Sequence, residues 1–148
     1  MIPDFYDGHF LPDGAHDATW QEVQTRFGSG AKRQSLCARM SQVLLTARRC
    51  GFREVFLFGS FISGKPDPGD IDLMWVYRSG SYEGMAPECQ EIVNHEMMKA
   101  RHGLDVFCCS DDRATIEDLL STWRVDRDRT KKRGIVRIDL ERFEGLII

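Results

Sequence analysis

The stretch that decides the fold is FLFGSFISGKPDPGDIDL, residues 56–73. Its hydrophobic start ends at Gly59-Ser60, and Asp70-x-Asp72 opens a second hydrophobic segment after nine intervening residues. Residues i and i+2 of a strand point to the same side, so the Asp70 and Asp72 carboxylates leave one face together. Two like charges so close repel each other unless a cation joins them, and Mg²⁺ prefers carboxylate and phosphate oxygens. The pattern predicts a metal site held on a sheet.

Gly59 and Ser60 fit a phosphate site beside that metal. Glycine lets the backbone approach a phosphate closely, because no side chain intervenes. If a helical turn begins at Ser60, its free N–H groups form an anion site, and the Ser60 hydroxyl adds a donor. We therefore expect one segment to hold phosphates and the next to hold the metal that bridges to them.

A third carboxylate follows in a later hydrophobic segment. Asp105 lies near the start of the apolar run of residues 103–107. If this run forms a strand beside the Asp70-x-Asp72 strand, the three carboxylates converge and can hold two metals about 3.5–4 Å apart. Asp105 would then help hold the catalytic metal and accept the proton of an attacking hydroxyl. The alternative is a strand-edge acid that faces water.

Hydrophobic periodicity predicts a single α/β domain over residues 1–148. Residues 1–18 are expected to form an irregular arm, and residues 53–109 the motif-bearing core. The expected strands cover residues 53–58, 71–77, 104–109 and 134–140. The expected helices cover residues 19–28, which open with a Thr19–Glu22 capping box, residues 31–50 and 87–100, and a last segment capped by Ser110 or Asp111 that buries Ile116, Leu119, Leu120 and Trp123.

Composition excludes several classes of protein. With 42% hydrophobic and 29% charged residues, the chain is typical of a globular protein, and no apolar run suits a membrane span or a signal peptide. A net charge of -3 argues against a surface built to bind nucleic acid. The five cysteines are irregularly spaced, which argues against a disulfide framework or a zinc site and fits a reducing cytoplasm.

Two other features have ordinary interpretations. The basic segment of residues 124–133 is best interpreted as a solvated loop. The alternative is a contact with RNA phosphate or with an acidic surface of a partner. None of the four histidines forms a ligand-spaced pair, and His95, between Glu91 and Lys99, is expected on a solvated helix face.

The motifs of residues 53–109 resemble the signature of the DNA polymerase β-like nucleotidyltransferase superfamily. Minimal nucleotidyltransferases of bacterial toxin–antitoxin pairs are similar to this chain in size. The resemblance implies the nucleotidyltransferase fold, with a mixed central sheet of about four to five strands flanked by helices. It also implies Mg²⁺ (with Mn²⁺ as an alternative) and transfer of a nucleoside monophosphate from a nucleoside triphosphate with release of pyrophosphate. It implies catalytic and metal-binding roles for Asp70, Asp72 and Asp105, and nucleotide binding by Gly59 and Ser60.

The chain departs from this family at one position. Minimal nucleotidyltransferases often carry Arg-Gly where this sequence has Ser63-Gly64, so a positive charge near the triphosphate is missing there. Lys65 is the candidate replacement, and the alternative is a solvated loop lysine. The acceptor hydroxyl could belong to a protein, an RNA or a small molecule. A single domain favours an acceptor that docks by itself, such as a partner protein in a toxin–antitoxin or defence system.

Two hypotheses compete with that of an active nucleotidyltransferase. The first is a module of the same fold with weak or no turnover that acts by binding a partner protein. The second is a nucleic-acid-binding protein that uses the basic segment.

Overall fold

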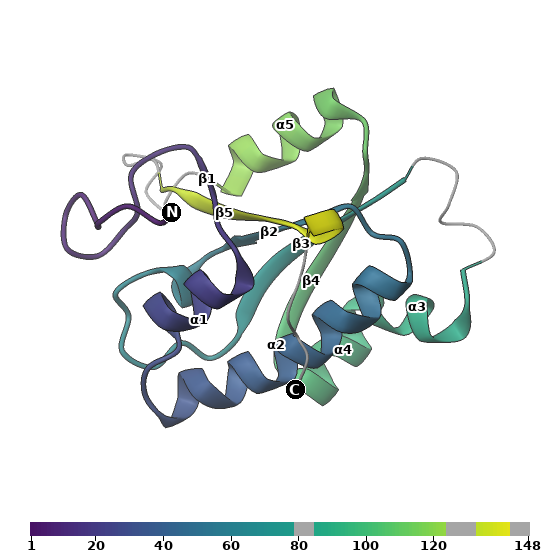
Figure 1. Cartoon of the computed structure of the whole chain (residues 1–148), viewed down its shortest axis with the longest axis horizontal. Helices are drawn as coiled ribbons and strands as arrows, with labels where there is room; N and C mark the ends of the chain where they lie inside the picture. The colour runs from purple at the N-terminus through teal and green to yellow at the C-terminus, as the bar shows by residue number, and fades with distance from the viewer. Residues whose placement is uncertain (79–84, 124–132, 143–148) are drawn as a thin grey trace.

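A five-stranded mixed sheet forms the centre of the protein (Figure 1). The computed structural model describes residues 1–78, 85–123 and 133–142. Its strands are β1 (Ala15–Asp17), β2 (Glu54–Phe58), β3 (Ile71–Tyr77), β4 (Leu104–Ser110) and β5 (Ile135–Asp139), in the spatial order β1-β5-β2-β3-β4. β2 runs antiparallel to β3 and β5, whereas β3 is parallel to β4 and β1 is parallel to β5. The predicted α/β class with a mixed sheet is confirmed.

Helices cover the two faces of the sheet unequally. In Figure 1, α5 lies alone on one side, and the other four helices lie on the opposite side. Those four helices are α1 (Trp20–Phe27), α2 (Ala31–Arg49), α3 (Pro87–Ile92) and α4 (His95–His102), and α5 spans Arg113–Trp123. None of these helices, in the described parts of the chain, has the length and apolar composition needed to cross a bilayer.

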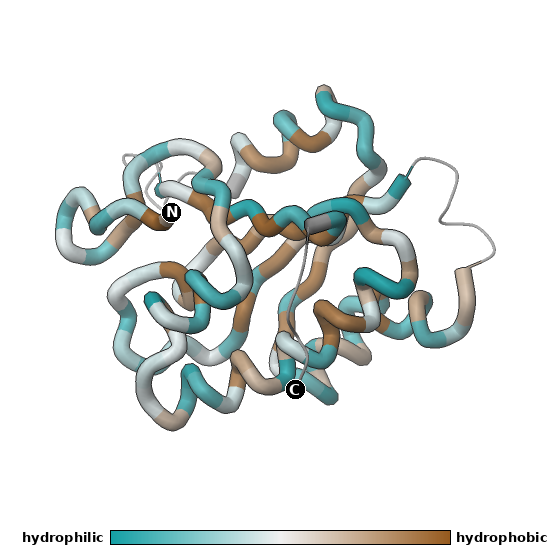
Figure 2. The backbone as a smooth tube through the Cα atoms, in the orientation of Figure 1, coloured by the Kyte–Doolittle hydropathy of each residue, from teal (hydrophilic) through white to brown (hydrophobic). Residues whose placement is uncertain are grey.

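The alternation of side chains along the strands divides the interior into two cores. Val55 and Leu57 of β2 join the larger core under α1 and α2, while Phe56 and Phe58 join a smaller core under α5. Figure 2 shows hydrophobic residues along the central strands between these layers. Because one short helix covers the second face, the strand ends on that face are left for polar side chains.

The single helix expected over residues 87–100 is two helices. Asn94 interrupts it, and its side-chain oxygen accepts a hydrogen bond from the Met97 backbone N–H at 3.0 Å, which caps α4. In α4 Met98 is buried, whereas Ala100 is exposed. The prediction failed because an asparagine that fits a helix interior by periodicity favours the cap position for its hydrogen bond.

Two smaller expectations also need correction. The N-terminal arm is not irregular throughout, because it ends in β1, which pairs with β5. The cap of α5 is Asp112, not Ser110 or Asp111, since the Asp112 carboxylate accepts a hydrogen bond from the Thr115 backbone N–H at 3.1 Å. The Thr19 capping box of α1 is confirmed. The basic segment of residues 124–132 and the Trp123 side chain lie outside the described residues.

The cysteines differ from expectation in one respect. A disulfide joins Cys50, at the end of α2, to Cys89 in α3, with the two Cα atoms 5.8 Å apart. The two residues lie 39 positions apart in the chain, and only the packing of α3 on α2 brings them together. Cys37, in α2, is buried and is not part of a disulfide.

Candidate metal centre

Three aspartates converge at one end of the sheet, on the face that α5 covers in part. In the strand register, Phe58 of β2 lies opposite Asp72 of β3, and Asp72 lies opposite Asp105 of β4. Asp70 immediately precedes β3, two residues before Asp72. Each of Asp70, Asp72 and Asp105 offers a carboxylate oxygen within 4.8 Å of the others. The sequence prediction that β4 would lie beside β3 and bring Asp105 to the pair therefore agrees with the geometry.

Asp72 is the central and most perturbed member of this cluster. Burial, together with the charges of Asp70 and Asp105, raises the pKa of Asp72 from 3.8 to about 7. A carboxyl in this position resists ionisation unless a cation compensates it. Without bound metal, a pKa of about 7 leaves Asp72 protonated up to near neutral pH, and a divalent cation bound there would displace this proton.

Gly59 makes room for Asp72. The glycine has a φ of +79°, and a Cβ placed on it would lie 3.0 Å from the Asp72 Cγ and closer still to Oδ2. Any side chain at position 59 would therefore push the central carboxylate out of place, in addition to the backbone strain of a positive φ. From the sequence, a glycine was expected here because it lets a phosphate approach the backbone closely. The space needed by the Asp72 carboxylate is a second reason for a glycine at this position.

Ser60 begins the short 3₁₀ turn η1 (Ser60–Ile62), so the turn expected at this residue is present. The turn is closed by Ser63, whose hydroxyl donates to the Ser60 carbonyl at 2.7 Å and whose N–H donates to the same oxygen at 3.1 Å. Ser60 itself is half-buried. Gly59 and Ser60 thus lie directly beside Asp72, at the end of β2.

Arg33, which sequence reasoning missed, holds the loop between Ser60 and Asp70. Its side chain is only 7% exposed, and its guanidinium donates to four backbone carbonyls. The acceptors and N–O distances are Phe27 at 3.0 Å, Phe61 at 2.6 Å, Ser63 at 3.0 Å and Lys65 at 2.6 Å. A signal existed in the sequence, because Arg33 falls three and four residues before Leu36 and Cys37 on the apolar face of α2.

Lys65, predicted to bind phosphate, is fixed only through its backbone. Its carbonyl accepts from Arg33, and its N–H donates to the Ser63 hydroxyl at 3.2 Å, while the side chain is exposed. Among the described residues, Lys65 forms no ion pair with the three carboxylates. Its predicted role remains a prediction that this geometry does not support.

Two basic residues of α4 are found at the site instead. The Lys99 ammonium donates to Asp70 Oδ2 at 2.7 Å, and His95 Nε2 is hydrogen-bonded to Asp105 Oδ1. His95 and Lys99 are four residues apart, so they share one helix face. His95 and Lys99 are both exposed, as the expected solvated helix face predicts, but α4 packs against the edge strand β4, so this face also reaches the carboxylates. The spacing was readable in the sequence, but the helix placement was not.

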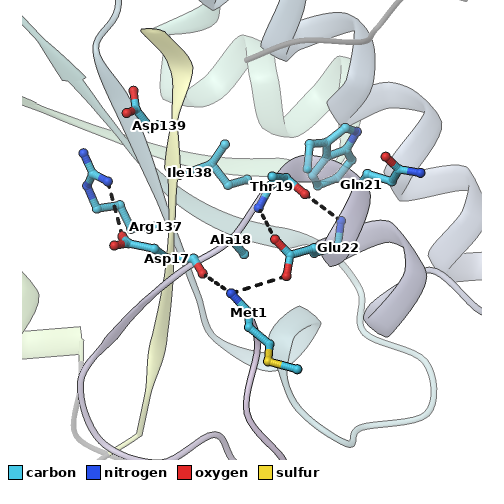
Figure 3. A pocket seen from close by; sticks show the side chains of 10 residues that line it. Met1, Asp17, Ala18, Thr19, Gln21, Glu22, Arg137, Ile138 and Asp139 are labelled. Atoms are coloured by element: carbon cyan, nitrogen blue, oxygen red, sulfur yellow. Dashed lines mark hydrogen bonds and ion pairs between the residues drawn. The ribbon is translucent and has the colours of Figure 1, made fainter. Parts of the chain in front are cut away.

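A separate hollow of about 560 Å³ lies between the start of α1 and β5 (Figure 3). In it Arg137 donates to Asp17 at 3.2 Å, and Glu22, which already closes the Thr19 capping box, lies near the amino group of Met1. None of the three clustered aspartates lines it. The acidic cluster therefore stands out by its chemistry and not by the size of a cavity.

The comparisons with known proteins bear on the family alone. A model of a family of unknown function, DUF6932, matches residues 3–139. The chain belongs to this family. Comparison with curated proteins and with solved structures finds no match. The matched range spans nearly the whole chain and includes Gly59, Ser60 and the three aspartates.

Proposed function

We propose that this DUF6932 protein is a Mg²⁺-dependent nucleotidyltransferase that moves a nucleoside monophosphate from a nucleoside triphosphate to an acceptor hydroxyl. The observation that carries the proposal is the convergence of Asp70, Asp72 and Asp105 beside the Gly59-Ser60 turn. The motif resemblance in the sequence is independent of that geometry, since spacing along a chain does not by itself bring Asp105 to Asp72.

The residues present fit a divalent cation. Three carboxylates supply the oxygen ligands that Mg²⁺ prefers. Burial, followed by the charges of Asp70 and Asp105, raises the pKa of Asp72, so a bound cation would favour its ionised form. Gly59 leaves the space that the Asp72 carboxylate occupies. Asp70, Asp72 and Asp105 would hold Mg²⁺, either one ion or a two-metal pair, and Mn²⁺ would suit the same ligands. When bound, the metal neutralises phosphate charge and stabilises the reacting oxygens of an in-line displacement.

The side chains of the chain itself have distinct roles in this proposal. Lys99 supplies the positive charge that is missing at Ser63-Gly64, because its ammonium already lies at the acidic cluster. Asp105 accepts the proton of the acceptor hydroxyl, and His95 orients the Asp105 carboxylate through its hydrogen bond. Gly59 and Ser60 border the phosphates at the end of β2.

Thermal melting with Mg²⁺ and each ribonucleoside triphosphate tests the proposal. A ligand at a hundred times its dissociation constant adds about 2.7 kcal/mol of stability, which raises the melting temperature by roughly 5–10 °C in a domain of this size. The shift should require metal and should vanish in Asp70→Asn/Asp72→Asn. Asp118→Asn, an exposed aspartate of α5, is the matched control and should respond like the unmodified protein.

If a triphosphate raises the melting temperature, the next experiment identifies the acceptor of the nucleotidyl group. Label carried on the α-phosphate of the triphosphate should move to a protein, an RNA or a small molecule, and a partner protein in a toxin–antitoxin or defence system is the favoured acceptor class. A protein that no triphosphate stabilises at millimolar concentration would contradict the proposal.

One observation favours a second candidate, a partner-binding module without turnover. Asp70 and Asp105 are already paired with Lys99 and His95, so the chain partly compensates its own acidic cluster. In that case Asp70→Asn/Asp72→Asn would leave the biological effect intact, whereas the enzyme hypothesis requires its loss.

A further inference from the structure

An exposed aromatic ring lies next to the acidic cluster. Phe107 follows Asp105 by two residues on β4, so both side chains project from the same face of the strand. On the adjacent strand β3, Phe107 lies opposite Met74, which follows Asp72 by two residues and projects from the same face. The Phe107 side chain is 37% exposed, unlike the other β2–β4 hydrophobic residues of this face, which are buried in the smaller core.

Phe107 has a defined aromatic setting. Its ring centroid lies 6.0 Å from that of Phe58, which is buried at the end of β2, and 5.7 Å from that of His95. The His95 ring is tilted by 50° from the Phe107 ring, so it forms a side wall next to that ring. Since His95 also bonds Asp105, the aromatic surface and the acidic cluster are one continuous group.

We propose that Phe107 is the surface on which the purine base of the nucleoside triphosphate stacks, with His95 as the side wall. This inference rests on the proposed function. The strand rise of about 3.3 Å per residue puts the Phe107 Cα about 7 Å from that of Asp105, a separation that one nucleotide spans between its phosphates and its base. A flat base gains free energy on an aromatic face, and a bicyclic purine covers both the Phe107 ring and the adjoining wall better than a pyrimidine does.

Calorimetric titration with two probes separates the base from the phosphates. ATP carries both parts, and inorganic tripolyphosphate carries the phosphates alone, each added with Mg²⁺. Phe107→Leu keeps an apolar side chain but removes the ring, and Phe107→Tyr keeps the ring. We expect Phe107→Leu to weaken ATP binding about tenfold and to leave tripolyphosphate binding unchanged, whereas Phe107→Tyr should bind both like the unmodified protein. The preference for ATP over CTP should disappear in Phe107→Leu.

The outcomes distinguish this inference from the function on which it rests. If the unmodified protein binds neither ATP nor tripolyphosphate with Mg²⁺, both proposals fail. If it binds ATP and loses binding in Asp70→Asn/Asp72→Asn but not in Phe107→Leu, the nucleotide site stands and the stacking surface is refuted. If Phe107→Leu lowers the melting temperature and weakens both probes equally, Phe107 supports the fold and the inference is also refuted. Tighter binding of CTP than of ATP by the unmodified protein would overturn the assignment to a purine.

Discussion

Replacing Asp72 by Asn should stabilise the protein when metal is absent. The amide has nearly the shape of the carboxyl but no charge, so it removes the repulsion from Asp70 and Asp105 and the cost of burying an ion. The folded protein raises the pKa of Asp72 from 3.8 to about 7, which at 1.36 kcal/mol per pH unit gives a ceiling of about 4 kcal/mol. Partial exposure of Asp72 to solvent screens these charges and reduces the expected gain to about 1–2 kcal/mol at pH 8.

The sign of the pH dependence follows from the direction of the shift. A carboxyl with a pKa raised by folding holds its proton more tightly in the folded state, so its ionisation favours unfolding. The penalty is absent below about pH 4, grows as the pH rises toward 7 and is complete above 7. The gain from Asp72→Asn should therefore be largest at pH 8 and nearly gone at pH 4.5.

Urea unfolding with EDTA at pH 4.5 and 8, and with Mg²⁺ at pH 8, measures these effects. Mg²⁺ should stabilise the unmodified protein and Asp118→Asn, but not Asp72→Asn, so the metal reverses the order of stability. A variant less stable than the unmodified protein at pH 8 in EDTA would refute the electrostatic reasoning. Equal stabilisation of both proteins by Mg²⁺ would show that Asp72 is not a ligand.

Three further variants test the rest of the site. Gly59→Ala should lose about 1–3 kcal/mol of stability and its Mg²⁺ response, because the new Cβ meets Asp72 at a positive φ, whereas Gly69→Ala, which meets no atom within 4 Å, should change neither in urea melts. Arg33→Lys should cost about 2–4 kcal/mol, since a single ammonium cannot serve four carbonyls, and an unchanged urea midpoint would contradict this. Lys99→Gln should tighten Mg²⁺ binding in calorimetry, because it frees the Asp70 carboxylate. The same variant should weaken triphosphate binding. If Mg²⁺ binding and triphosphate binding change in the same direction, Lys99 has no role in binding phosphate.

Local chemistry made much of this protein readable in advance. The alternation of β3 and the two-residue spacing of Asp70 and Asp72 are properties of a strand, and they hold wherever the strand lies. The Thr19 capping box is likewise complete within four residues. The predicted starts of α4 and α5 were wrong, because the side chains of Asn94 and Asp112 cap these helices. Hydrophobic periodicity carries no information on such caps.

The partners of the site residues could not be predicted from the sequence, because they depend on packing between elements that are distant in the chain. His95 and Lys99 had to be placed by α4 against β4, and Arg33 finds its carbonyl acceptors in residues 27–65 only after α2 packs beside the η1 loop. The disulfide between Cys50 and Cys89 depends on helix packing in the same way.

The sequence by itself determined which residues carry the acidic chemistry and which face of each strand presents them. The tertiary structure alone decided that Asp105 lies opposite Asp72, that two basic side chains of α4 reach the cluster, and that Phe107 stays exposed beside it. The physical reason is that periodicity fixes the direction of a side chain relative to its own backbone. The neighbours of that side chain depend on strand register and helix packing, which are set by the free energy of the whole chain.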